Sequence, residues 1–225
     1  MTVDGGMTIE KIMTVAEIYK KYNIPPNLIE HQLTVAKVIC VLQKHWLGVE
    51  INWQEMILIG LMHDIGNIVK FDFDKYPEFL GQEKKNLVFW KEEQKRIIKK
   101  YGKDDHLAVK KILKELNLNL HIDEVIQKKS FKNSELIAQS DDWYTKILAY
   151  ADLRVLPGGI GTLDERIEDV RKRIPKYSTR KDFPELINAA RKLESQIQIV
   201  VGLPISKILE EVKTISSIEL LKLDY

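Results

Sequence analysis

Hydrophobic positions recur at intervals of three and four residues along nearly the whole chain, a pattern typical of amphipathic helices. No segment alternates as a half-buried strand does, and no internal repeat is present. The sequence therefore predicts an all-α fold, a compact multi-helix bundle. In the first half of the chain, helices are predicted from a cap at Thr8 to before Asn23, from Pro25-Pro26 to about Trp46, after Asn52, and over Glu83–Tyr101. In the second half, they are predicted around His106 to near Leu116, before Asp152, after Thr162, from a cap at Asp182 to near Gly202, and from Pro204 onward.

Helix start signals support several of these boundaries. Asn52 is a favourable N-cap, and Glu55 three residues later can complete a capping box. Thr162-Leu-Asp-Glu165 is a second capping box, and Ser140 or Asp141 is suited to cap the helix that leads to Asp152. The residues between the helix that ends near Leu116 and this cap are expected to form a connector.

The helix that begins after Asn52 ends in an unusual way. From Met56 to Met62 it has no polar face, so it should be buried on nearly all sides, and His63 and Asp64 follow directly. A carboxylate near a helix C-terminus opposes the helix dipole, and burying it without a partner costs several kcal/mol. A bound metal cation would compensate, and His and Asp are suitable ligands. The alternatives are a chance dipeptide and a pairing of Asp64 with a buried Lys or Arg.

Two more polar residues, His31 and Asp152, also lie in apolar helical patterns that should be buried. His31 lies at helical spacing with Val35, Val38 and Leu42, where a histidine is more often a hydrogen-bonded core residue than a ligand. Asp152 stands late in an apolar helix, again against the dipole. A single cation shared by all of these sites is a simpler explanation than a separate one for each.

The order His31, His63-Asp64, Asp152, each on its own helix, resembles the HD superfamily of metal-dependent phosphohydrolases. The resemblance extends over about Ile24 to Arg173. It is carried by four segments, which are NIPPNLIEHQLTVAKVICVLQ, ILIGLMHDIGN, DDHLAVKKILKEL and KILAYADLRVLPGGIGTLDERIED. It implies an HD-domain bundle over residues 1–175, with an additional C-terminal helical extension over 176–225 packed on the same domain. It also implies that His31, His63, Asp64 and Asp152 are the metal ligands.

The chain departs from the commonest family pattern in two places. Asn67 stands where many members carry Lys or Glu, and it cannot act as a general acid or base; Lys70, one turn further on, is the expected substitute. The segment after His106 offers Lys128 and Lys129 but not the further histidine of dinuclear members. We therefore expect one divalent ion. The mixed nitrogen and oxygen ligands do not determine its identity, so Mn, Co, Ni, Fe, Mg and Zn are all candidates.

A glycine-rich segment, Gly158-Gly159-Ile160-Gly161, precedes a predicted helix, as a phosphate-binding loop does. It lacks the preceding strand and the lysine of a P-loop, so a flexible turn is the better interpretation. If this turn folds near the metal, Arg154 and Arg166 are candidates for binding substrate phosphate, because a guanidinium can donate two parallel hydrogen bonds to phosphate oxygens. Surface salt bridges are the alternative role for both.

These residues predict a metal-dependent phosphohydrolase in which a metal-activated water attacks phosphorus. Asp64 would bind the metal and orient the water, while His106, and Lys70 in place of Asn67, would assist catalysis. The expected substrate is a small nucleotide-like phosphate ester. The alternatives are a non-catalytic metal-containing nucleotide sensor or scaffold of the same fold, and an all-helical interaction protein without metal.

Composition bears on the partners and the cellular location that we expect for the protein. Lys and Arg number 35 against 33 Asp and Glu, a net charge of +2 that gives no support for a nucleic-acid partner. The single cysteine, Cys40, lies in an apolar helical pattern and is expected to be a core residue. No apolar run reaches the roughly 20 residues that span a bilayer, so we expect a cytoplasmic protein. The C-terminal helices are expected to pack on the domain, to form a homodimer contact, or to do both.

Overall fold

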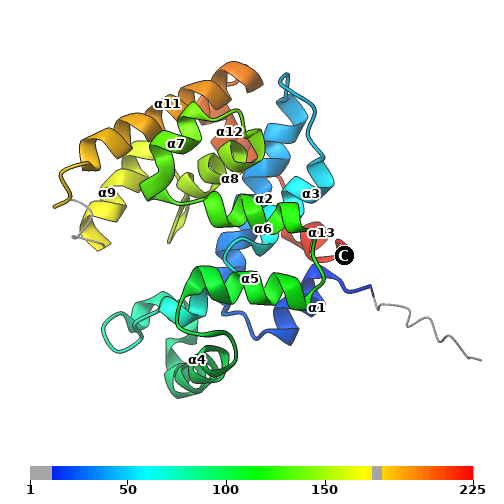
Figure 1. Ribbon diagram of the computed structural model, residues 1–225, viewed down its shortest axis with the longest axis vertical. Coiled ribbons are helices and arrows are strands. Elements are labelled where there is room, and N and C mark those ends of the chain that lie inside the picture. The colour runs from blue at the N-terminus through cyan, green and yellow to red at the C-terminus, as the bar shows by residue number, and fades with distance from the viewer. Residues whose placement is uncertain (1–11, 174–178, 225) are drawn as a thin grey trace, which may run out of the picture.

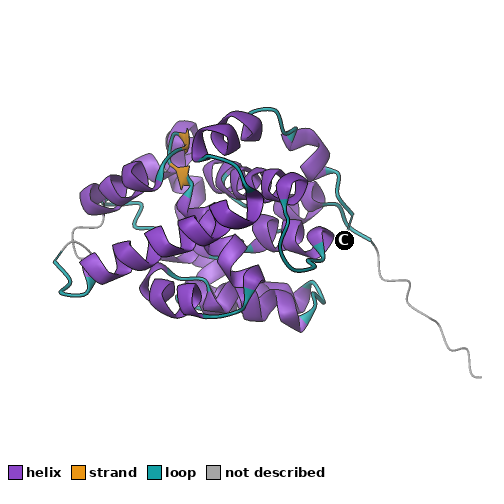
Figure 2. Cartoon of the chain, turned by 90° about the horizontal axis from the view of Figure 1, so that it is seen from above, coloured by secondary structure: helices purple, strands orange, loops and turns teal. Residues whose placement is uncertain are grey.

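The computed structural model describes residues 12–173 and 179–224, and it confirms the all-α prediction (Figures 1 and 2). Helices make up nearly all of the ordered elements, and the described strands form one two-residue hairpin. With η marking 3₁₀ segments, the helices are α1 (Val15–Lys21), α2 (Pro26–His45), α3 (Trp53–Met62), η1 (Asn67–Lys70), η2 (Pro77–Asn86), α4 (Leu87–Tyr101), α5 (Asp105–Glu115), α6 (Leu120–Lys128), η3 (Phe131–Asn133), α7 (Ser134–Gln139), α8 (Trp143–Leu153), α9 (Leu163–Arg173), α11 (Phe183–Val201), α12 (Ile205–Val212) and α13 (Ser217–Leu221). The hairpin strands are β1 (Val155–Leu156) and β2 (Gly159–Ile160), where we expected a flexible turn.

The long helix α2 lies at the centre of the bundle (Figure 1) and packs against α3, α8, α12 and α13. Its length follows from a proline in the first turn and an uninterrupted apolar face. Val35, Val38 and Leu42 on that face are fully buried, as their spacing predicted. The face that carries His31 is therefore held rigidly against the neighbouring helices.

Helix α3 begins as the sequence predicted, since the Asn52 side chain accepts a hydrogen bond from the Glu55 N–H. The second hydrogen bond of the predicted capping box, from the Asn52 N–H to the Glu55 carboxylate, does not form. The Glu55 carboxylate instead accepts hydrogen bonds from Asn119 and His121, and the Asn52 N–H donates to the Tyr144 hydroxyl. These contacts connect the start of α3 to the helices that follow α5.

Other predicted boundaries need correction. Thr14, with a complete capping box to Glu17, begins α1, whereas the predicted cap Thr8 lies outside the described residues. The helix expected over Glu83–Tyr101 starts only at Leu87, because the preceding segment is 3₁₀ and is interrupted at Gly81 with φ of 54°.

The expected connector before the Asp152 helix is instead helical, containing α6 and α7. Asn119 caps α6, and Ile122, Val125 and Ile126 bury its apolar face. Asp142, rather than Ser140 or Asp141, caps α8, since its carboxylate accepts a hydrogen bond from the Thr145 N–H at 3.0 Å.

The C-terminal helices share the core of the preceding ones. Helix α11 packs against α7 and α8, and α12 packs against α2, so the two parts bury a common set of apolar side chains (Figure 1). The predicted domain boundary at residue 175 lies outside the described residues and stays a prediction. Within the described parts of the chain, no helix combines the length and the apolar character required to cross a membrane.

Two glycines allow the helices around His63 to approach closely. A Cβ on Gly60 would lie 2.6 Å from the Ile39 side chain, and one on Gly66 would lie 2.7 Å from the Val109 backbone nitrogen. Both distances are far inside van der Waals contact. Gly60 therefore lets α3 pack closely on α2, and Gly66 lets η1 lie directly against α5.

We predict that Gly66→Ala lowers the free energy of unfolding by about 1–3 kcal/mol, since the new methyl group meets fixed backbone. Gly158→Ala is the matched control, because a Cβ there meets no atom within 4 Å. The control should change stability by no more than about 1 kcal/mol. Urea unfolding of both variants measures the difference, and equal stabilities would contradict the close approach at Gly66.

Candidate metal centre

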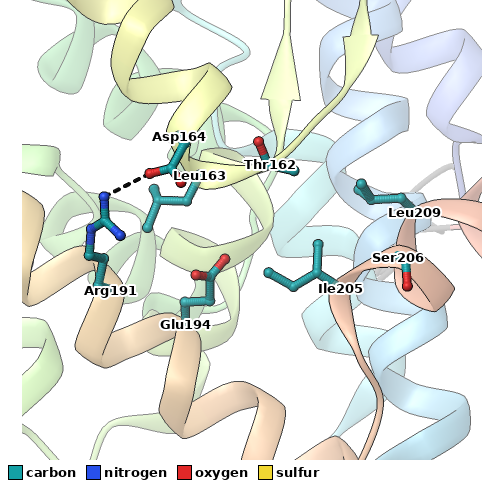
Figure 3. Close-up of a pocket in the computed structure, with 8 residues that line it drawn as sticks. All are labelled: Thr162, Leu163, Asp164, Arg191, Glu194, Ile205, Ser206 and Leu209. Carbon is teal, nitrogen blue, oxygen red and sulfur yellow. Dashed lines mark hydrogen bonds and ion pairs between the residues drawn. The ribbon is translucent and has the colours of Figure 1, made fainter.

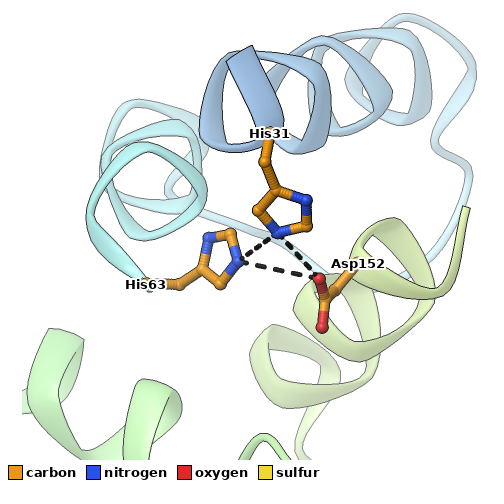
Figure 4. Close-up of side chains that lie close together, drawn as sticks. All are labelled: His31, His63 and Asp152. Atoms are coloured by element: carbon orange, nitrogen blue, oxygen red, sulfur yellow. Dashed lines mark hydrogen bonds and ion pairs between the residues drawn. The ribbon is translucent and has the colours of Figure 1, made fainter. Parts of the chain in front are cut away.

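Three helical elements bring the predicted ligands together. His31 lies in the second turn of α2, His63 is the C-cap of α3 with Asp64 directly after it, and Asp152 is in the last turn of α8. These helices pack against one another in all three pairs. Figure 4 shows the side chains of His31, His63 and Asp152 pointing toward a common point.

The spacing of the donor atoms suits a metal ion. His31 Nε2 lies 3.2 Å from His63 Nε2 and 3.1 Å from Asp152 Oδ1, while His63 Nε2 lies 3.7 Å from Asp152 Oδ1. The Asp64 oxygens lie 3.6 Å from each of the two imidazole nitrogens. Adjacent ligands around an ion with bonds of about 2.1 Å are separated by about 3.0–3.4 Å. His31, His63 and Asp152 therefore form a cluster that fits a divalent ion, whereas Asp64, the fourth predicted ligand, lies beside this cluster and is not part of it.

A backbone hydrogen bond prepares His63 for this role. Its Nδ1–H donates to the carbonyl oxygen of Gly60 at 2.7 Å, and its side chain is fully buried. With the proton on Nδ1, the Nε2 lone pair is free and points at His31 and Asp152. A histidine oriented in this way by its other nitrogen is the usual arrangement in protein metal sites.

Buried polar contacts also hold the turn that carries Asp64. The side-chain oxygen of Gln32, a fully buried residue of α2, accepts a hydrogen bond from the Asp64 N–H at 3.4 Å. The Tyr19 hydroxyl donates to the carbonyl oxygen of Leu61 at 2.6 Å. The Tyr19 contact supplies a donor to a carbonyl oxygen at the C-terminal end of α3, where carbonyl groups lack partners within the helix, and the Gln32 contact satisfies the N–H of Asp64, which follows the helix. Gln32 was not among the predicted site residues, although its position next to His31 was a usable signal.

Lys129 contacts both carboxylates, so the alternative expected from the sequence, a pairing of Asp64 with a buried Lys or Arg, is present in the structure. Its Nζ lies 3.2 Å from Asp64 Oδ1 and 3.1 Å from Asp152 Oδ2, and its side chain is only 15% exposed. Asp152 therefore uses its two oxygens differently. Oδ1 faces the imidazoles, and Oδ2 accepts a hydrogen bond from the ammonium.

This ammonium controls the charge state of the centre. Burial opposes ionisation of Asp64, but Lys129, together with the nearby imidazoles and Lys70, lowers the pKa of its carboxyl below the usual range. The pKa of Asp152 is lowered well below its usual value against the same effect of burial, chiefly by Lys129. Burial disfavours the charged form of Lys129 in turn, and the two carboxylates nevertheless raise its pKa. Both acids are therefore ionised and Lys129 is protonated at neutral pH.

The other predicted catalytic residues lie in neighbouring elements. The Lys70 ammonium contacts Asp105 at 2.8 Å, close enough to Asp64 to help lower the pKa of that acid. Asn67 is buried in η1, with 5% of its surface exposed. His106 is in the first turn of α5, and its imidazole is not part of the cluster formed by His31, His63 and Asp152. The catalytic roles of Lys70 and His106 stay predictions.

Both arginines that were candidates for phosphate binding have acidic partners within the protein. Arg154 is fully buried, with Nη2 2.8 Å from Glu194 Oε1 and the guanidinium over the Tyr150 ring. Arg166 contacts Asp169 at 3.0 Å. Both arginines therefore form salt bridges, the alternative role given to them above, although the salt bridge of Arg154 is buried and not on the surface. Phosphate binding by either residue stays a prediction.

A cavity of about 330 Å³ lies near Arg154, between α9, α11 and α12 (Figure 3). Its lining residues are Thr162, Leu163, Asp164, Arg191, Glu194, Ile205, Ser206 and Leu209. None of these belongs to the metal-ligand cluster. Arg191 contacts Asp164 at 2.8 Å, as Figure 3 shows, and Glu194 contacts Arg154. Because its charged residues are paired in this way, the cavity offers no unpaired cation to a phosphate group.

A model of the HD domain family matches residues 28–154, which is more than half of the chain. The match includes His31, His63, Asp64 and Asp152, and it also includes Lys129. No curated protein and no solved structure matches the chain.

We predict that Mn²⁺ at 100 times its Kd raises the free energy of unfolding by about 2.7 kcal/mol, because it binds the folded state. His31→Ala should remove this stabilisation. His45→Ala is the matched control, since His45 is on the same helix but contacts Glu211, and it should retain the effect. Urea unfolding with and without Mn²⁺ measures this stabilisation for each variant. Equal stabilisation of His31→Ala would contradict the ligand assignment.

Proposed function

This protein belongs to the HD domain family, the superfamily of metal-dependent phosphohydrolases, and we propose that it hydrolyses a small nucleotide-like phosphate ester at the cluster of His31, His63 and Asp152, with Asp64 beside it. The observation that carries the proposal is the convergence of two imidazole nitrogens and Asp152 Oδ1 within 3.1–3.7 Å of one another. One of the two imidazoles, that of His63, is fixed in the tautomer that binds metal.

The chain's own groups suit phosphate hydrolysis. A divalent ion in this site would lower the pKa of a bound water and polarise a phosphate oxygen. Because the pKa of Asp64 is low, its carboxylate remains a hydrogen-bond acceptor at neutral pH and can orient the attacking water. The ammonium groups of Lys129 and Lys70 offset negative charge that a phosphate brings into the site.

An aromatic segment next to α2 supports a nucleotide-like substrate. Asn27, one turn before His31 on the same helix face, donates a hydrogen bond to the carbonyl oxygen of Phe79. The rings of Tyr76 and Phe79 are stacked with centroids 5.3 Å apart, and Phe79 also contacts Phe71. Partly exposed rings so close to the ligand helix are suited to stack on a base.

One observation favours the second candidate, a non-catalytic metal-containing nucleotide sensor or scaffold. Asn67 is buried, and its N–H donates to the carbonyl oxygen of Asp64; a Lys or Glu at this position would supply an acid or base, and an amide supplies neither. The ionised Asp64 carboxylate favours hydrolysis instead, since it can accept a hydrogen bond from an attacking water, a role that a sensor does not need. Turnover separates the two candidates.

We predict phosphate release from at least one member of a panel of nucleoside mono-, di- and triphosphates and cyclic or dinucleotide diesters in the presence of Mn²⁺, with a phosphatase added for the diesters. Asp64→Asn should reduce release at least about 100-fold, because it removes a charged ligand and the water acceptor. Asp164→Asn is the control, since Asp164 contacts Arg191 away from the centre, and it should keep full activity. Bound Mn²⁺ without release from any ester would favour the sensor.

We predict that His106→Ala reduces kcat about 10-fold or more while leaving the Kd for Mn²⁺ within about twofold, as expected for a proton-transfer group outside the ligand set. Kinetics with the best substrate of the panel and a calorimetric Mn²⁺ titration measure the two values. An equal loss of Mn²⁺ binding would make His106 a ligand.

A further inference from the structure

The position of Lys129 between the two acids has a consequence for the number of ions that the centre holds. We propose that the Lys129 ammonium occupies the place of a second cation between Asp64 and Asp152 and so restricts the centre to one divalent ion. This inference rests on the proposed function, because it assumes that His31, His63 and the two acids bind a metal.

The carboxylate geometry supports the proposal. Asp152 turns Oδ1 to the imidazoles, at 3.1 Å from His31, and Oδ2 to Lys129, also at 3.1 Å. A carboxylate that bridges two metal ions uses its oxygens in the same way, one for each cation. Lys129 also lies 3.2 Å from Asp64 Oδ1, so both acids contribute an oxygen to the ammonium. The oxygens that a second metal ion would need are already hydrogen-bonded.

The charges lead to the same conclusion. Asp64 and Asp152 supply two negative charges, and their two imidazole neighbours are neutral when they bind metal. One divalent ion and the Lys129 ammonium already exceed this negative charge by one. A second divalent ion would be repelled by the ammonium at hydrogen-bond distance from the same oxygens. The excess positive charge instead suits an anionic phosphate substrate.

The fold fixes the ammonium in this position. Lys129 is the C-cap of α6, and its N–H donates to the carbonyl oxygen of Val125. Helix α6 packs against α3, α5 and α8, two of which carry or precede metal ligands. The adjacent Lys128 behaves differently, because its side chain is 57% exposed and contacts Asp142. The two neighbouring lysines therefore form a natural comparison.

The test is the number of Mn²⁺ ions that the full-length protein binds, measured by equilibrium dialysis and by the electron paramagnetic resonance spectrum of the bound ion. Wild type and the matched control Lys128→Met should each bind one Mn²⁺ with a single-ion spectrum. Lys129→Met should bind the first Mn²⁺ at least 10-fold more tightly and then a second one. Ions about 3.5–4 Å apart, as in two-metal sites, should give an exchange-coupled spectrum.

A stoichiometry of one in Lys129→Met at saturating Mn²⁺, with a wild-type circular dichroism spectrum, would overturn the proposal. Lys129→Gln, which keeps a polar side chain, is the second variant if the first does not fold, and the same result would overturn it there. Failure of the proposed function gives a different result. If wild type binds no Mn²⁺, the metal centre is wrong and the role of Lys129 is overturned with it. If wild type binds one Mn²⁺ and releases no phosphate from any ester, only the proposed activity is wrong.

Discussion

The structure depends on the need to neutralise two largely buried carboxylates. Asp64 and Asp152 both lie at the C-terminal ends of their helices, where the helix dipole disfavours a negative charge, and only 15% and 21% of their side chains are exposed. An unpaired buried charge costs several kcal/mol, so such acids persist only with cations beside them. Lys129 supplies one positive charge from within the chain. The two imidazoles provide ligands for another cation on the opposite side of Asp152.

The apolar core serves this arrangement by fixing its distances. Helix α2 is buried among α3, α8 and the C-terminal helices, and Gly60 allows α3 to approach it closely. The Gly60 carbonyl also accepts the hydrogen bond that orients His63, so this one residue sets both the helix spacing and the tautomer of a ligand. Because packing fixes these distances, metal binding at this centre should require little reorganisation of the side chains.

Much of the fold and the order of the ligands could be predicted from local sequence. The apolar helix that ends at His63-Asp64 and the cap at Asn52 follow from periodicity and capping chemistry. Lys129 could not be recognised in this way, since it stands beside Lys128 in a polar segment and only the packing of α6 distinguishes a buried lysine from an exposed one. Arg154 illustrates the same limit, because its buried partner Glu194 is distant in sequence and belongs to a helix that no local pattern connects to it.

The most direct test of a one-ion centre between the imidazoles and the two acids is a crystal structure of the protein soaked in Mn²⁺, with anomalous diffraction data to locate the ion. We expect one anomalous peak per chain within about 2.0–2.3 Å of His31 Nε2, His63 Nε2 and oxygens of Asp64 and Asp152, with Lys129 still in contact with both acids. A peak elsewhere, or an intact Lys129 contact with both acids and no ion at the imidazoles under saturating Mn²⁺, would contradict it.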